Sequence, residues 1–144
     1  MEILTKEWKN AKDIALLILR LALGFFLIHG HGWGKLQVIF SGAEIEFMDP
    51  IGIGATLSFY LAAFAEGIAA FLLIIGLFTR LAAVVLMLNF LAIFYTHVIL
   101  FNDAYLNLEL QNLFFFGFLV VFIMGPGKHA IDYAVFKKNR GVKK

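Results

Sequence analysis

The sequence lacks cysteine entirely among its 144 residues. Disulfides, thiolate metal sites, c-type haem attachment and a persulfide carried on this chain are therefore excluded. Charge is also scarce, because Asp, Glu, Lys and Arg make up only 15% of the residues and the formal net charge is +2. The basic residues gather near the chain ends instead of along one face, so nucleic-acid binding is not expected.

Apolar residues are present in large excess. The chain is 62% hydrophobic and 16% aromatic, with a mean hydropathy of +0.89. Soluble proteins contain about 45–50% apolar residues even when glycine is included. The composition predicts an integral membrane protein with one domain. A cleaved signal peptide is not expected, because the first apolar run is long and ends in HGHGWGK without a small-residue cleavage site.

Long apolar runs define the expected organisation, because a helix needs about 20 apolar residues to cross a bilayer. We predict an amphipathic lead-in at residues 1–13, a four-helix membrane domain over 14–136 and a basic tail at 137–144. The membrane domain should end in a short interfacial segment near residues 131–136. The four spans are expected at residues 14–35, 51–78, 81–101 and 105–124.

The distribution of Lys and Arg predicts the orientation of these spans. With four spans, both termini and the turn at Arg80 lie on the same side of the membrane. Of the 12 Lys and Arg residues, all except Arg20 and Lys35 fall on that side. Cytoplasmic loops carry such an excess of positive charge. We therefore expect an all-α, antiparallel four-helix bundle in the inner (plasma) membrane of a prokaryotic cell, with both termini in the cytoplasm.

Two charged residues lie inside apolar runs, Arg20 in the first and Glu66 in the second. A charge in lipid is unfavourable unless it meets a partner or a cavity. Alanines three and four residues on either side of Glu66 place it on a small-residue face that favours close helix packing. The simplest expectation is an Arg20–Glu66 ion pair between the two helices, with a proton or ligand role as the alternative.

The first apolar run also carries a cluster of polar and small residues near its end. At about 100° per residue, Gly24 and His31 share the face of Arg20, whereas His29 points away. His31, His97 and Glu109 should lie at a similar depth near the outer ends of three helices, at a rise of about 1.5 Å per residue. They are expected to line one outward-facing pocket, or alternatively to be interfacial residues in contact with water and headgroups.

The same three side chains have the composition of a facial metal triad. Their positions in the sequence show no close ligand spacing, so no metal and no haem is expected. Imidazole groups suit proton handling because their unperturbed pKa lies near neutrality.

Several separated motifs resemble the DoxX family of small four-helix membrane proteins, whose relatives include the DoxD subunit of thiosulfate:quinone oxidoreductase. The motifs are RLALGFFLIHGHGWGK, then AEGIAAFLLIIGLFTRLAAVVL, a histidine late in the third span, and GPGKHAID. The resemblance covers residues 14–132 and implies a quinone-linked redox role or a membrane subunit of a redox complex. Positions that the family pattern keeps polar are Arg20, His31, Glu66 and Arg80.

The leading functional hypothesis is an oxidoreductase subunit that passes electrons from a small periplasmic reductant, such as thiosulfate, to a non-covalently bound membrane quinone. In this hypothesis His31 and His97 contact the quinone oxygens or move protons, and Glu109 orients a histidine or passes protons. The expected remaining binding residues are Arg20, Glu66, Asn89 and Lys35. The alternatives are a non-catalytic membrane anchor or assembly subunit, with a partner redox subunit or as a homo-oligomer, and a small-solute carrier.

Overall fold

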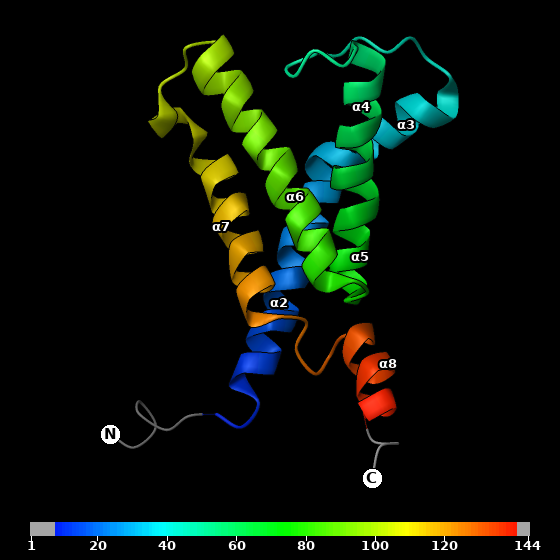
Figure 1. Ribbon diagram of the computed structural model, residues 1–144, viewed down its shortest axis with the longest axis vertical. Helices are drawn as coiled ribbons and strands as arrows, with labels where there is room; N and C mark the ends of the chain where they lie inside the picture. Colours follow the sequence, from blue (N-terminus) through cyan, green and yellow to red (C-terminus); the bar gives the residue numbers. More distant parts are fainter. Residues whose placement is uncertain (1–7, 141–144) are drawn as a thin grey trace.

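The computed structural model describes residues 8–140, apart from the side chains of residues 105–106 and 136–140. Over this range the chain forms helices, turns and loops and no strand, which confirms the all-α prediction. Residues 1–7 of the predicted lead-in and residues 141–144 of the predicted tail lie outside the described residues. The long helices stand side by side, with the start of α2 and all of α8 at the lower end of the molecule (Figure 1).

The helices occupy each of the predicted apolar stretches, and several of them change type along their length. The first runs without a break through α2 (Ala11–Leu27), the π-helical segment η1 (Ile28–Gly32) and α3 (Trp33–Ser41). The remaining elements are α4 (Ala55–Ala63), η2 (Phe64–Ala69), α5 (Ala70–Ile75), α6 (Thr79–Phe94), η3 (Tyr95–Leu100), η4 (Tyr105–Leu108), α7 (Glu109–Met124) and α8 (Ile131–Arg140).

Three π-helical segments interrupt these helices, and each contains titratable residues. The segment η1 holds His29 and His31, η2 holds Glu66, and η3 holds His97. A π-helical turn contains an extra residue and is found frequently at functional sites. We therefore expect the functional site near these segments, in the upper half of the molecule.

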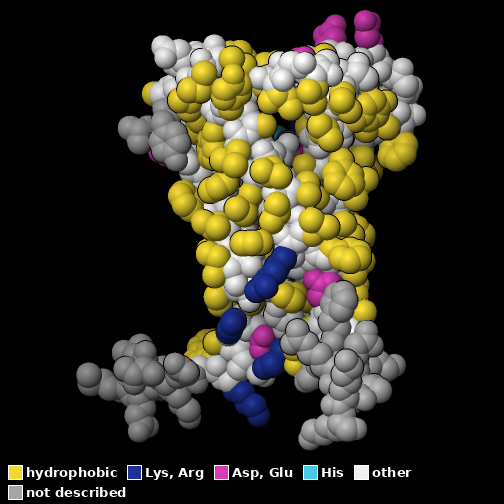
Figure 2. Space-filling model, in the orientation of Figure 1, with side chains coloured by type: hydrophobic (Ala, Val, Ile, Leu, Met, Phe, Trp, Pro, Cys, Tyr) yellow, Lys and Arg dark blue, Asp and Glu magenta, His cyan; other side chains and the backbone are white. Residues whose placement is uncertain are grey.

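Among the described helices, Ala55–Ile75 and Thr79–Leu100 are each long and apolar enough to span a bilayer, with mean hydropathies of 2.0 and 2.2. The outward face of the first is an apolar stripe at helical spacing, formed by Leu57, Leu61, Phe64, Ile68 and Phe71, all exposed. Hydrophobic side chains cover the middle of the molecule, and the Lys and Arg side chains visible on this face lie at the lower end (Figure 2).

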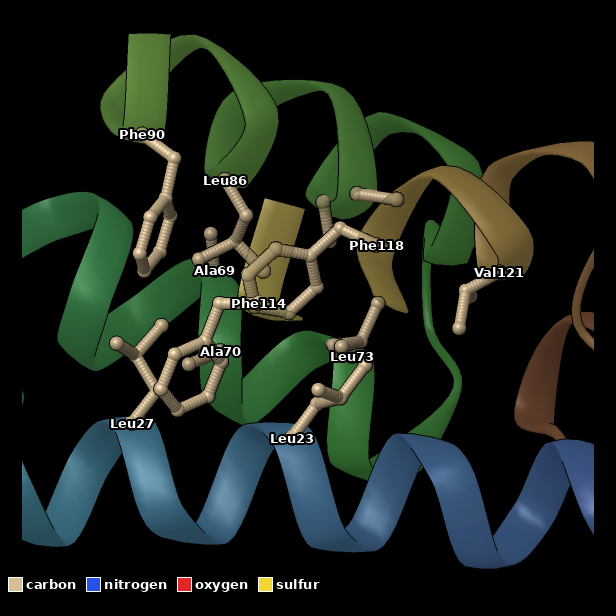
Figure 3. Packing of buried hydrophobic residues seen from close by; sticks show 12 residues of the cluster. Leu23, Leu27, Ala69, Ala70, Leu73, Leu86, Phe90, Phe114, Phe118 and Val121 are labelled. Atoms are coloured by element: carbon tan, nitrogen blue, oxygen red, sulfur yellow. The ribbon is translucent and has the colours of Figure 1, made fainter. Parts of the chain in front are cut away.

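A buried apolar cluster joins α2, η2, α5, α6 and α7, with Ala69 and Ala70 among larger leucine and phenylalanine side chains (Figure 3). The rings of Phe90 and Phe114 lie 5.4 Å apart, and those of Phe114 and Phe118 6.0 Å apart. In lipid, such packing stabilises helix association by van der Waals contact, because small residues let the helices approach closely. The cluster is formed by Leu23, Leu27, Ala69, Ala70, Leu73, Ala82, Ala83, Leu86, Phe90, Phe114, Phe118 and Val121.

Polar contacts hold the lower end together. Asp132 accepts hydrogen bonds from the backbone N–H groups of Phe78 and Thr79, each at 2.8 Å, and so caps the start of α6. Arg20 is fully buried, and its Nη2 donates to the carbonyl of His129 at 2.9 Å. These contacts tie α2 and the turn between α5 and α6 to the segment that leads into α8.

Candidate functional site

A cavity of about 370 Å³ lies between the helix α4–η2 and the helix α6–η3. It forms because α6 packs against η2 and α5 but diverges from α4 toward the upper end (Figure 1). A hollow is visible between the upper parts of these helices (Figure 2). The walls are mainly apolar, and the loop residues 47–51 contribute to the upper part. The polar side chains that line the cavity are Ser58, Glu66, Asn89, Thr96 and His97.

Glu66 is the charged residue at the lower end of this cavity, and its side chain is almost fully buried. Its Oε2 lies 2.6 Å from Nζ of Lys35, and its Oε1 accepts a hydrogen bond from Nδ2 of Asn89 at 3.0 Å. The three side chains come from η2, α3 and α6. Both carboxylate oxygens therefore have partners, and the Lys35 ammonium compensates the charge.

Glycines explain how Lys35 comes within reach of Glu66. Gly32 lies against the backbone of η2, where a Cβ would collide with the carbonyl of Glu66. A Cβ on Gly67 would meet the side chain of Leu36 at 3.2 Å. The first two helices thus cross closely at this level, and Lys35, one turn beyond Gly32, reaches across the crossing.

His97 lies at the other end of the cavity, in η3. Its Nδ1 is 2.9 Å from Oδ2 of Asp103, and the backbone N–H of Asp103 donates to the carbonyl of His97 at 2.9 Å. An ionised carboxylate only accepts hydrogen bonds, so this contact places a proton on Nδ1. The Nε2 atom is then a hydrogen-bond acceptor in the neutral ring and a donor in the protonated ring.

The loop above the cavity is fixed by Asp49. This carboxylate accepts hydrogen bonds from the N–H groups of Gly54 at 2.7 Å and Ile53 at 2.9 Å, and from the hydroxyl of Ser58 at 2.9 Å. These hydrogen bonds, first of all the one from Gly54, hold the pKa of Asp49 below its ordinary value. The same loop brings the ring of Phe47 against that of Phe59, at 5.4 Å.

The predicted site residues separate into two groups. Glu66, Asn89 and His97 line the cavity, and Lys35 joins them through Glu66. His31 in η1 and Glu109 at the start of α7 are exposed and do not line it. The structure therefore does not bring His31, His97 and Glu109 together in this cavity.

The predicted ion pair between Arg20 and Glu66 is wrong. Arg20 binds the carbonyl of His129 and faces the charge of Asp132, whereas Glu66 binds Lys35 and Asn89. The two residues lie at different depths along the helices. Arg20 is level with Gly76, because a Cβ added to Gly76 would collide with the guanidinium of Arg20. Gly76 follows Glu66 by ten residues, a rise of about 15 Å. Each charge instead meets a partner at its own level.

Sequence reasoning did not identify Asp49 and Asp103 as parts of the site. Asp103 follows His97 by six residues across a helix end, and Asp49 precedes the first turn of α4, where a carboxylate commonly accepts hydrogen bonds from free N–H groups. Asp103 could have been recognised as a helix-end carboxylate close to His97, and Asp49 as a carboxylate that precedes a helix start.

The fold and the cavity define an all-helical membrane protein. The pocket between its helices has apolar walls and polar side chains at both ends. A DoxX family model matches residues 15–98, more than half of the chain, and the chain belongs to the DoxX family. The matched range includes every residue that lines the cavity. No curated protein and no solved structure matches the chain.

Proposed function

We propose that the chain is the quinone-binding membrane subunit of an oxidoreductase, and that the cavity between α4–η2 and α6–η3 holds the quinone ring. The observation that carries this proposal is the cavity itself, which is apolar along its walls and has hydrogen-bonding side chains at both ends. Its volume of about 370 Å³ is in the range of small-ligand sites, which combine apolar walls with a few orienting polar groups.

The proposal includes a position in the bilayer, which the same helices support. In this proposal the chain crosses the membrane four times as an antiparallel bundle, and the start of α2, the turn before α6 and α8 face the cytoplasm. The exposed apolar band around the middle of the molecule supports this arrangement, as does the location of Lys and Arg at the lower end (Figure 2). The cavity then opens in the outer half of an inner membrane.

The donor set fits a quinone, which carries two carbonyl oxygens on one flat ring. The amide nitrogen of Asn89 has two N–H groups, of which one donates to Glu66 and the other remains for a ligand oxygen. His97 provides Nε2 at the opposite end, oriented by Asp103, and its protonated ring donates from Nε2 to a quinone oxygen. Lys35 and Glu66 neutralise each other, so the lower end of the cavity presents a polar group without a net charge to a neutral ring.

The bound quinone would supply two-electron chemistry, accepting electrons from a small reductant such as thiosulfate at the outer side. The chain's own residues have three tasks in this reaction. His97 holds or releases a proton at Nε2, Asp103 orients the imidazole, and Asn89 fixes the other end of the ring. The loop held by Asp49 limits access of water from above. Excluding water strengthens every hydrogen bond inside the cavity.

A cavity-filling substitution tests this proposal. Ala92 lines the cavity, whereas its neighbour Leu91 is exposed on the outside of α6 and does not line it. In lipid nanodiscs, Ala92→Phe should abolish binding of added quinone, measured by equilibrium partition and extraction. The matched variant Leu91→Phe should bind quinone like the wild type. Wild-type protein that binds no quinone, or an Ala92→Phe variant that binds it normally, would overturn the proposal.

A further inference from the structure

Two residues belong both to the cavity and to the outer surface of the helices. Leu61 on α4 and Leu88 on α6 line the cavity, yet their side chains are 50% and 60% exposed. The cavity is only partly enclosed. The cavity is therefore open sideways, between the outward faces of α4 and α6.

The surface around this opening is apolar on both helices. Leu57 of α4 and Phe64 of η2 flank Leu61, and Leu91 lies one turn from Leu88 on α6, all exposed. In the proposed membrane position these side chains face lipid tails. The opening thus leads from the cavity into the hydrocarbon layer, at the level of the helices rather than at their ends.

The loop above also contributes exposed lining residues, Met48 and Ile51, but this direction and the lower one lead past hydrogen-bonded groups. The lower end is closed by the Lys35–Glu66–Asn89 network. Asp49 fastens the loop above to the start of α4 through two backbone N–H groups and the hydroxyl of Ser58. A ligand that used the upper direction would have to displace this loop, whereas the lateral opening is lined by flexible leucine side chains.

We infer that the gap between Leu61 and Leu88 is a lateral portal, and that the ligand is a two-part amphiphile that enters through it from the bilayer. Its oxygen-bearing ring occupies the cavity between Asn89 and His97, and its long apolar tail passes between the two leucines into lipid. This inference rests on the proposed function and specifies the ligand as a long-tailed, isoprenoid-type quinone. A tailless ring would fit the same cavity without touching the portal.

Tryptophan substitutions at the portal test this inference. Leu61→Trp and Leu88→Trp narrow the gap, and Phe71→Trp and Leu81→Trp place the same side chain on the exposed surface of the same two continuous helices, away from the cavity and its opening. The probes are a quinone with a long isoprenoid tail and the same ring with a methyl group in place of the tail. Equilibrium binding of both is measured in nanodiscs.

The portal variants should weaken binding of the tailed quinone at least about tenfold while the tailless ring keeps its affinity within about twofold. The two control variants should bind both probes like the wild type. Three outcomes would overturn the portal. The portal variants could lose equal affinity for the two probes, they could bind the tailed quinone with unchanged affinity, or the control variants could show the same loss of affinity. Wild-type protein that binds neither probe would instead overturn the proposed function, and the portal with it.

Discussion

Nζ of Lys35 lies 2.6 Å from Oε2 of Glu66, which joins the upper part of the first helix to the middle of the second. The Glu66 side chain is almost fully buried, whereas the Lys35 side chain is 18% exposed. Breaking a buried pair from one side leaves an uncompensated charge, which is far less favourable than removing both partners. The pair therefore fixes how the two helices cross beside the cavity.

Substitution of Lys35 tests how much the fold depends on this ion pair. Lys35→Met leaves the Glu66 carboxylate with Asn89 alone and should destabilise the fold by about 3–5 kcal/mol, whereas Lys35→Met with Glu66→Gln should recover most of the loss. The free energy of unfolding in mixed micelles measures both. Arg20→Met combined with Glu66→Gln serves as the control and should give additive losses, because these residues bind different partners. If the losses of unfolding free energy in Lys35→Met and Glu66→Gln were additive in the double variant, the two side chains would not form an ion pair.

At the lower end of the molecule, Asp132 should stabilise the start of α6 through its hydrogen bonds to the backbone. Asp132→Ala removes the acceptor for the N–H groups of Phe78 and Thr79 and also the charge that faces buried Arg20, so it should cost at least the roughly 0.5–2 kcal/mol of a lost helix cap. Hydrogen exchange at these two amides should accelerate relative to amides in the middle of α6. Asp13→Ala removes a carboxylate paired with Lys128 at the surface and should have a smaller effect on stability. Unchanged exchange at Phe78 and Thr79 would show that the cap does not form.

The apolar runs predicted the helices because length and hydropathy dominate in a chain of this composition. The faces of those helices were harder to predict. An extra residue per turn rotates everything beyond a π-helical segment, so the 100° rule that placed His31 on the face of Arg20 fails after Ile28. Gly24, before that segment, is buried as expected, whereas His31 is exposed.

The partner of Glu66 could not be derived from helix periodicity alone. Lys35 was expected at the outer end of the first span, as a binding residue, because the apolar run ends there. In the structure the helix continues to Ser41, so Lys35 remains helical and turns toward the second helix. Its position depends on the close crossing at Gly32, a tertiary contact that the sequence pattern does not specify.

The loop above the cavity should loosen in acid. The pKa of Asp49 is lowered in the folded protein, chiefly by the hydrogen bond from Gly54, so the stability it contributes is present above the unfolded pKa and is lost as the pH falls through the folded value. The stability difference between wild type and Asp49→Asn should therefore be largest near neutral pH and shrink below about pH 4. Thermal unfolding across this range measures it. Glu44→Gln, an exposed substitution in the same loop, should change stability little at any of these pH values.

Orientation in the membrane can be tested cleanly because the chain has no cysteine. A single cysteine at Gly42, which is exposed in the loop after α3, should react with an impermeant thiol reagent on intact cells. A cysteine at Asn139 in α8 should react only after the membrane is opened, because the basic end is expected in the cytoplasm. The reverse labelling pattern would place the cavity in the inner half of the membrane.

His97 and Asp103 should act on quinone as one unit. His97→Ala removes the imidazole that donates from Nε2 in its protonated form at one end of the ring, and it should weaken quinone binding up to about tenfold, the worth of one hydrogen bond. Asp103→Ala leaves the imidazole in place without its orienting carboxylate, so it should weaken binding less. The double variant should bind no more weakly than His97→Ala, because Asp103 acts only through His97. His31→Ala, the exposed histidine outside the cavity, is the matched control and should bind quinone normally. A quinone affinity that falls in His31→Ala but not in His97→Ala would move the site away from this cavity and toward the outer face of η1.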